Sequence, residues 1–242
     1  MKQAFCYVRQ NRKNMRRVIS FLKELKEHND REWFNAHKEA YQEAQGVFNE
    51  YVSQLLLKLT AADETLTGLT VKDCVFRIYR DVRFSKDKSP YKTHMGAYIC
   101  RGGKKSGFSG YYFHVGVGGH GYPDGHILAV GDYCSDPKAL KILREDIQDD
   151  GLTFHNYLAD AAKAGFVLDD DWKLKKVPAG FDKDSEWAEL LKYKVYCLWQ
   201  EPDEELFVGD DSVDRVVQTM LAAKPFLDFV NRAIEYVKEG NE

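Results

Sequence analysis

The chain is predicted to form one α+β domain, in which an antiparallel sheet of about four to six strands is packed by N-terminal and C-terminal helices. Two patterns predict this class: apolar residues recur at helical spacing near both ends of the chain, and apolar strand-like runs separated by turns fill its middle. In addition, no repeat, low-complexity linker or change in composition divides the 242 residues. We therefore expect residues 15–242 to form a single domain.

The N-terminal part is predicted to contain an extension and two helices. Residues 1–14 carry four basic side chains and no acidic one, and the helical pattern begins only after them, so we expect them to lie outside the domain. A first helix is predicted from Arg16 to Leu25, and Asn29 or Asp30 can cap a second, long helix that reaches Leu59. The apolar stripe of this second helix favours packing on a sheet. Binding of a partner is the alternative.

The middle and the C-terminal part supply the remaining elements. Segments rich in Val, Ile, Tyr and Phe predict consecutive antiparallel strands, simplest as a meander, at 72–84, 95–101, 110–118 and 126–133. Asp136 and Pro137 are expected to open a helix that runs to about Gln148. Further along we expect helices at 153–164 and 185–192, a strand at 194–200, and a tail helix from Ser212 that Pro225 kinks or divides.

Composition excludes several classes of protein. A formal net charge of −3 argues against a general binder of polyanions, and no apolar run approaches the roughly 18 residues of a membrane span. Five scattered cysteines without a CxxC pair indicate reduced thiols, so we expect a cytoplasmic location. Motifs for nucleotides, metal-dependent proteolysis and acyl transfer are missing, and no cofactor is expected. The oligomeric state does not follow from the sequence.

The stretch from Arg77 to His94 concentrates positive charge, with six Lys or Arg and two Asp. Its first half alternates like a strand, which would place Arg77, Asp81 and Arg83 on a polar face as a clamp for an anion. Arg80 falls on the apolar face, where a guanidinium needs a carboxylate or several carbonyls around it. A solvated ladder of salt bridges is the alternative interpretation of the same residues.

The second half of the stretch is a predicted turn. Ser85, Lys88 and Tyr91 could close around a phosphate or carboxylate, and Asp87 is expected either to form the turn or to act as a general base. The candidates for proton transfer are Asp81, Asp87, His94 and His114.

A glycine-rich segment at 116–121 matches GxGxxG formally, but a turn and another strand follow it where a dinucleotide site requires a helix. We therefore expect a hairpin loop there. His114, His120 and His126 have no spacing known for zinc, so no metal site is expected. His114 lies within a predicted strand and could face the charged strand across a hairpin; a partly buried, hydrogen-bonded histidine is the plainer interpretation.

The pattern Arg77-x-x-Arg80-Asp81-x-Arg83-Phe84-x-x-Asp87-Lys88-x-x-Tyr91 resembles the signature of a bacterial family of uncharacterised proteins, a domain of unknown function also found within larger fungal proteins. The resemblance covers most of the chain from about Met15. It implies no activity, substrate or cofactor. It does favour a functional site over a chance ladder, because the matching positions are mostly polar.

These observations lead to three functional hypotheses. The first is a small anionic or phosphorylated ligand bound by Arg77, Arg80, Arg83, Lys88 and Tyr91, with cofactor-independent hydrolysis as the best-fitting reaction if the protein is an enzyme. The second is a module for nucleic acid or protein, in which tyrosines such as Tyr79 or Tyr112 stack on bases. The third is a charge network that only connects helices to the sheet. No membrane partner is expected.

Overall fold

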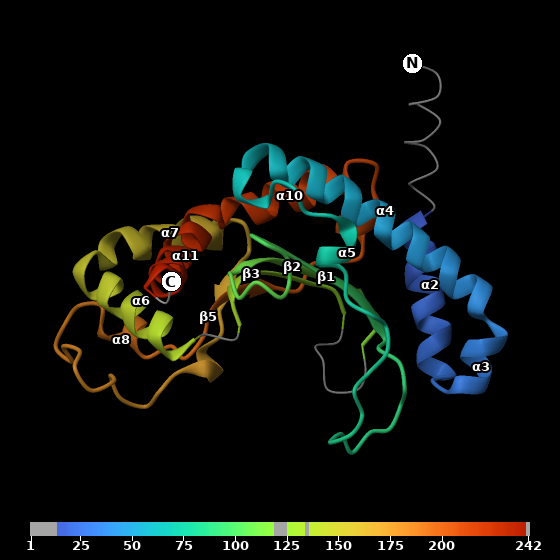
Figure 1. Ribbon diagram of the computed structural model, residues 1–242, viewed down its shortest axis with the longest axis horizontal. Helices are drawn as coiled ribbons and strands as arrows, with labels where there is room; N and C mark the ends of the chain where they lie inside the picture. Colours follow the sequence, from blue (N-terminus) through green and yellow to red (C-terminus); the bar gives the residue numbers. More distant parts are fainter. Residues whose placement is uncertain (1–13, 119–124, 134–135, 241–242) are drawn as a thin grey trace. The chain divides into compact units, whose positions relative to one another are not determined.

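The computed structural model describes residues 14–118, 125–133 and 136–240 (Figure 1). The predicted extension lies outside the described residues apart from residue 14. The helices are α2 Asn14–Glu27, α3 Arg31–Ala36, α4 Lys38–Ala62, α5 Val71–Cys74, α6 Pro137–Asp149, α7 Gly151–Lys163, α8 Ala188–Leu191, α9 Glu205–Val208, α10 Ser212–Ala222 and α11 Lys224–Glu239, with single 3₁₀ turns at Glu64–Leu66 and Asp170–Trp172. The strands are β1 His94–Cys100, β2 Gly110–Gly116, β3 Ile127–Asp132, β4 Val167–Leu168 and β5 Tyr196–Gln200.

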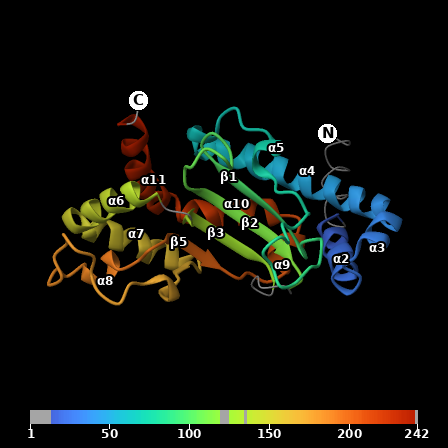
Figure 2. The ribbon, with the colours of Figure 1, turned by 60° about the horizontal axis from the view of Figure 1, so that its bottom comes forward.

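The strands of the described chain form one antiparallel sheet in the order β1-β2-β3-β5-β4, which confirms the α+β class. Figure 2 shows β1, β2 and β3 as neighbouring arrows, as expected for a meander. The edge strand β4 pairs with β5 so that Val167 lies opposite Trp199. None of the described helices is long and apolar enough to cross a membrane.

Contacts divide the chain into two compact units. The first comprises the chain up to Ile99 together with Tyr112–Leu128 and Glu201–Gln218. The second comprises Cys100–Tyr111, Ala129–Gln200 and the chain from Thr219 onward. Because the divisions fall at strands β1, β2 and β3, the chain passes repeatedly from one unit to the other. A single domain stays a prediction.

In the first unit, α4 packs on β2 through aromatic side chains. The ring of Phe48 lies 5.3 Å from that of Phe113, which in turn lies 6.3 Å from the ring of Phe207 in α9. All three rings are almost completely buried, and each contributes roughly 2–3 kcal/mol of apolar burial. The expected packing of the helical stripe on a sheet is therefore confirmed. The long helix itself is interrupted, since His37 separates α3 from α4.

The second unit has its own aromatic core, in which Phe154 of α7 contacts Tyr196 of β5 and Phe226 and Phe229 of α11. Figure 1 shows α6, α7 and α11 side by side. A buried cation, Arg144 of α6, donates hydrogen bonds to the backbone carbonyls of Leu191, the last residue of α8, at 2.9 Å and of Tyr193 at 2.7 Å. Carbonyl partners of this kind offset the cost of burying a guanidinium.

The predicted strand at 72–84 is wrong. Its first residues form the short helix α5. The rest forms only two isolated bridges in the described chain, one of Val75 with Ala97 of β1 and one of Tyr79 with Tyr91, which lies outside the named strands. Residues 75–93 therefore form an irregular loop, which we call the basic loop. The alternation of polar and apolar residues exists in the sequence, but it does not give two faces: Ile78 is buried, whereas Phe84 is 96% exposed.

Candidate functional site

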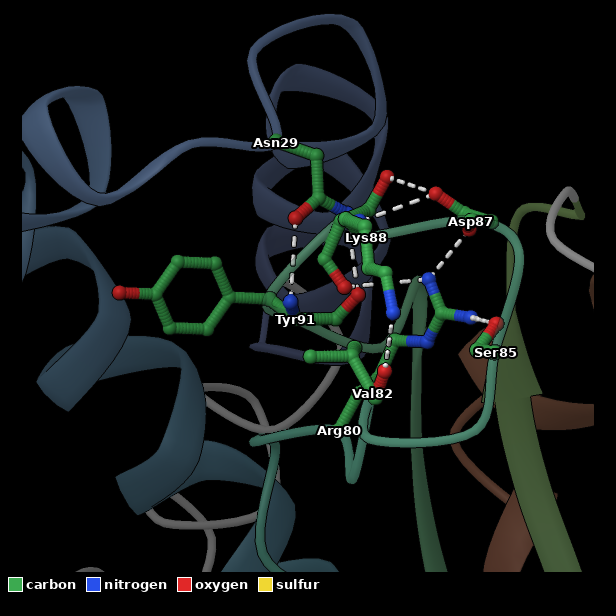
Figure 3. A network of polar contacts seen from close by, with 8 residues as sticks. Asn29, Arg80, Val82, Ser85, Asp87, Lys88 and Tyr91 are labelled. Carbon is green, nitrogen blue, oxygen red and sulfur yellow. Dashed lines mark hydrogen bonds and ion pairs between the residues drawn. The ribbon is translucent and has the colours of Figure 1, made fainter.

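The basic loop is closed by Arg80, whose side chain is only 14% exposed (Figure 3). Its guanidinium forms an ion pair with Asp87, donates to the carbonyl oxygen of Ser89 at 3.1 Å and reaches the hydroxyl of Ser85 at 3.4 Å. The expectation that a buried Arg80 needs a carboxylate or several carbonyls around it is met by Asp87, with the carbonyl of Ser89 in addition. These donors are used within the loop, which gives Arg80 and Ser85 an architectural role.

Asp87 forms the turn that the sequence predicted. Its Oδ1 accepts hydrogen bonds from the backbone nitrogen of Ser89 at 2.9 Å and from the hydroxyl of the same residue at 2.7 Å. These two bonds, followed by the bond from Arg80, hold the pKa of the Asp87 carboxyl well below its usual range. An ionised carboxylate whose oxygens are engaged in this way is a weak candidate for a general base.

Tyr91 ties the end of the basic loop to the helices. The side chain of Asn29 bonds both the backbone nitrogen of Tyr91, at 3.1 Å, and its carbonyl oxygen, at 3.0 Å. The ring of Tyr91 is buried and stacks on Phe34 with centroids 3.9 Å apart. Figure 3 shows that this ring points away from the Arg80 guanidinium. The structure therefore places Tyr91 in the core, apart from the arginines with which the sequence analysis grouped it.

The outer side of the loop carries a second pair. Arg83 binds both carboxylate oxygens of Asp81, at 2.9 and 2.6 Å, and these hydrogen bonds lower the pKa of Asp81 to about 2. Both side chains are largely exposed. Lys88 donates to the carbonyl of Val82 at 2.9 Å. Asp81 thus orients the Arg83 guanidinium, and the charge of Arg77 also acts on Asp81. The strand face on which the clamp of Arg77, Asp81 and Arg83 was predicted does not exist, and the clamp itself stays a prediction.

Two further cations of the basic loop form no ion pair of this kind in the described chain, although the charge of Arg77 adds to the lowering of the Asp81 pKa. Neither Lys92 nor Arg77 forms an ion pair with a carboxylate of the described residues. Lys92 is half-buried, with its Nζ 5.4 Å from the centre of the Phe76 ring. Burial, and then the neighbouring charge of Arg77, lower the pKa of Lys92. The proximity of these two positive charges therefore makes the free energy of folding less favourable.

Next to Lys92 lies a pair of buried histidines. His94 of β1 and His114 of β2 stack with ring centroids 4.6 Å apart. Nδ1 of His114 lies 2.9 Å from the hydroxyl of Tyr112, and its Nε2 lies 3.1 Å from the carbonyl oxygen of Gly125. Burial lowers the pKa of His94 to about 3 and that of His114 to about 4, and the charge of Lys92 acts in the same direction on both. Both rings are neutral at neutral pH.

No group of three His, Cys, Asp or Glu side chains in the described ranges is placed to hold a metal ion. His126 accepts a hydrogen bond from the backbone nitrogen of Gly116 at 3.2 Å through its Nδ1. His120 lies outside the described residues, as does most of the segment with the GxGxxG pattern.

The structure brings the predicted site residues together in three separate groups: Arg80 with Ser85 and Asp87, Asp81 with Arg83, and His94 with His114. Sequence reasoning gave no role to Lys92 and considered Tyr112 only as a stacking surface. A signal existed for Tyr112, because residues two apart on a strand share a face and His114 is two residues away. Lys92 offered no signal of its own among six basic residues.

Comparison with known proteins gives one match. Residues 17–229 match the family model described as "Conserved hypothetical protein (DUF2461)". No curated protein and no solved structure matches the chain.

Proposed function

Because this chain belongs to the DUF2461 family of conserved hypothetical proteins, whose description names no activity, we propose its function from the site: it binds a small anionic or phosphorylated ligand at Lys92 and Arg77. The observation that carries this proposal is the half-buried, unpaired Lys92 beside a second cation. Buried charges in proteins are ordinarily paired, and an anion of the ligand would supply the missing partner. A cytoplasmic location forms part of this proposal.

Arg77 suits the second contact. It is exposed and carries a planar guanidinium that can bind two oxygens of a phosphate or carboxylate at once. The contact of Lys92 with the Phe76 ring is worth only about 0.5–1 kcal/mol, which is less than the cost of taking an ammonium group out of water. An oxyanion placed between the two cations would make both charges favourable.

Lys92→Gln tests this proposal, with Lys86→Gln as the matched control because Lys86 is an exposed lysine of the same loop. Melting temperatures are measured with and without inorganic phosphate and a panel of phosphate monoesters and carboxylates. We expect the parent and Lys86→Gln to gain stability, by about 1.4 kcal/mol at a ligand concentration of ten times Kd, and Lys92→Gln to gain little or none. Without ligand, Lys92→Gln should melt at the same temperature as the parent or higher, because it removes a charge from a poorly solvated position.

A parent protein that responds to none of these anions would refute the proposal, as would a Lys92→Gln variant that responds as the parent does. Loss of stability in Lys92→Gln without ligand would instead assign Lys92 to the scaffold.

Nucleic acid is the second candidate ligand, favoured by one observation. Phe84 is 96% exposed, Tyr79 is 50% exposed, and the Arg83 guanidinium lies 5.9 Å from the Phe84 ring, so the outer side of the loop offers aromatic surface together with cations. The formal net charge of −3 acts against it. In the same melts, single-stranded oligonucleotides should stabilise the parent but not Phe84→Ala if this candidate is right, and binding should weaken steeply with salt.

A further inference from the structure

A chain of hydrogen bonds runs from the phenol of Tyr112 through the imidazole of His114 to the carbonyl of Gly125. The direction of these bonds follows from their chemistry. A carbonyl oxygen only accepts, so Nε2 of His114 carries the proton and donates to Gly125. In a neutral ring Nδ1 is then the acceptor, and the Tyr112 hydroxyl donates to it. The Tyr112 hydroxyl, the His114 imidazole as its base and the Gly125 carbonyl that orients this ring are thus arranged in series.

Glycines make room for this arrangement on both sides of His114. A Cβ atom at Gly96 of β1 would lie 3.1 Å from the Tyr112 hydroxyl oxygen and 3.2 Å from Cβ of His114. A Cβ atom at Gly116 would lie 2.6 Å from the carbonyl oxygen of Gly125 and 3.1 Å from Cβ of His94. Distances near 3 Å or below leave no space for a side chain, so any other residue at these places would displace the chain of hydrogen bonds.

The imidazole of His114 is held as a neutral base. Burial is the main cause, and the groups that face it are His94, which stacks on it, together with His126 and Lys92, whose charges act against protonation. A ring that is neutral at neutral pH has an Nδ1 lone pair that accepts the hydrogen bond of the hydroxyl. Because burial weakens this nitrogen as a base, it takes the proton only as the phenolic oxygen bonds to the substrate. Tyr112 itself is only partly buried, so part of its side chain faces solvent.

The ring of Tyr112 and the ammonium group of Lys92 both lie near the ring of Phe76. The ring of Phe76 is 6.3 Å from that of Tyr112 and carries Lys92 at 5.4 Å from its centre, so Lys92 and Tyr112 border the same aromatic side chain. A ligand held by its anionic group at Lys92 would extend toward the phenol. The approach of a substrate to Tyr112 thus rests on the proposed function, the binding of an anion at Lys92.

We propose that Tyr112 is a nucleophile activated by His114, acting in group transfer from an anionic substrate. The phenolic oxygen forms a bond to the electrophilic atom of the substrate while the bond to the leaving group breaks, with its electron pair going to that group. The proton of Tyr112 passes to Nδ1 of His114 and then to the leaving group. Water, the second reactant, attacks the same atom; His114 takes a proton from it and returns that proton to the released phenolate. The sum is hydrolysis of the substrate, and the enzyme is restored.

Aryl sulfonyl fluorides test the nucleophile directly, because a tyrosine oxygen displaces fluoride from sulfur and the adduct is mapped by peptide mass spectrometry. The probes are 4-(fluorosulfonyl)benzoate, which carries an anionic group, and neutral benzenesulfonyl fluoride. Tyr236 and Tyr79 serve as internal references, since they are 68% and 50% exposed and have no histidine hydrogen-bonded to their hydroxyl in the described chain. We expect Tyr112 to react at least about tenfold faster than either, since a positioned base typically contributes about 10²-fold or more.

His114→Gln should reduce the rate at Tyr112 to that of the reference tyrosines, whereas Lys92→Gln should slow only the anionic probe. Labelling of Tyr112 no faster than of Tyr236 in the parent overturns the proposal even where His114→Gln fails to fold. An equal rate in folded His114→Gln overturns it as well.

The two proposals fail differently. If Tyr112 reacts rapidly with both probes and Lys92→Gln changes neither rate, the anion site is wrong and the nucleophile stands. If phosphate stabilises the protein while Tyr112 stays unreactive, the anion site stands and the nucleophile is wrong.

Discussion

At the scale of single residues, the basic loop shows that equal charges can have opposite roles. Arg80 donates to Asp87, Ser89 and Ser85, and these three hydrogen bonds are all made within the loop. Lys92 has no carboxylate partner among the described residues and gains only a ring contact. Arg80 therefore stabilises the fold, whereas Lys92 destabilises it. This difference is why we assign ligand binding to Lys92.

Arg80→Met should loosen the basic loop. The substitution keeps most of the aliphatic stem but removes donors to a carboxylate, a carbonyl and a hydroxyl, so we expect a loss of about 1–2 kcal/mol in the free energy of unfolding. Hydrogen exchange followed by mass spectrometry should show faster exchange of the amides at 80–92. Arg83→Met is the control: its pair with Asp81 is exposed, and denaturant midpoints should not move. Equal effects of both substitutions would contradict the architectural role of Arg80.

At the scale of elements, a close approach of β3 and β5 depends on one glycine. Gly131 has φ +128°, and a Cβ atom there would lie 2.4 Å from the carbonyl oxygen of Tyr196. Gly131→Ala combines a strained backbone with a clash against the neighbouring strand, and we expect it to lower the free energy of unfolding by about 2 kcal/mol or more.

Gly46→Ala is the matched control, because it should change the free energy of unfolding in the opposite direction. Gly46 lies within α4 with no atom within 4 Å of an added Cβ, so alanine should stabilise the helix by roughly 0.5–1 kcal/mol. Urea denaturation of both variants measures the difference, and a Gly131→Ala variant as stable as the parent would disprove the close approach of the two strands.

The same scale shows what the sequence could and could not predict. Strands β1, β2 and β3 were predicted nearly to the residue, because runs rich in Val, Ile, Tyr and Phe there are bounded by turns. The segment 72–84 has a similar composition, yet the loop to which it belongs is held by a residue far away: Asn29 binds the backbone of Tyr91, 62 positions later. Local periodicity contains no information about such a partner.

The break at His37 was missed for a related reason. The apolar stripe continues across it, while the ring of His37 donates from Nδ1 to the carbonyl of Trp33 at 2.8 Å and stacks on the indole at 4.1 Å. The side chain of His37 thus donates a hydrogen bond to a backbone carbonyl next to the break, and apolar periodicity gives no sign of such a bond. In the candidate site, the sequence identified the charged stretch from Arg77 to His94. Only the structure separates the residues that hold the loop together from the cations without a carboxylate partner among the described residues.

At the scale of the whole molecule, the family match from residue 17 to residue 229 covers parts of both compact units. The buried histidines give the molecule a dependence on pH. In the folded state the pKa values of His94 and His114 lie near 3 and 4, whereas an unfolded histidine has a value near 6.5. The unfolded chain therefore binds more protons below about pH 6.5, and acid favours unfolding.

Stability should consequently fall as pH decreases from 6.5 to 4, with each histidine adding up to about 1.4 kcal/mol per pH unit to the slope. His126, whose pKa burial also lowers, acts in the same direction. The carboxylates with lowered pKa values contribute mainly below pH 4, so this window reports the histidines. Urea unfolding at intervals of half a pH unit measures the slope. His94→Gln and His114→Gln should flatten it; an unchanged slope in both variants would contradict neutral rings.

The double hydrogen bond of Asn29 to Tyr91 has a consequence for chemical ageing. Its amide acts as a substitute for a peptide group, offering one donor and one acceptor to the backbone of the loop. Spontaneous deamidation would convert the donor into a carboxylate oxygen about 3.0 Å from the carbonyl of Tyr91, where two acceptors repel each other. A change of one mass unit, without loss of any buried apolar surface, would thus remove the hydrogen bond to the carbonyl of Tyr91, leave the stack of Tyr91 on Phe34 to hold the loop, and alter the surroundings of the adjoining Lys92.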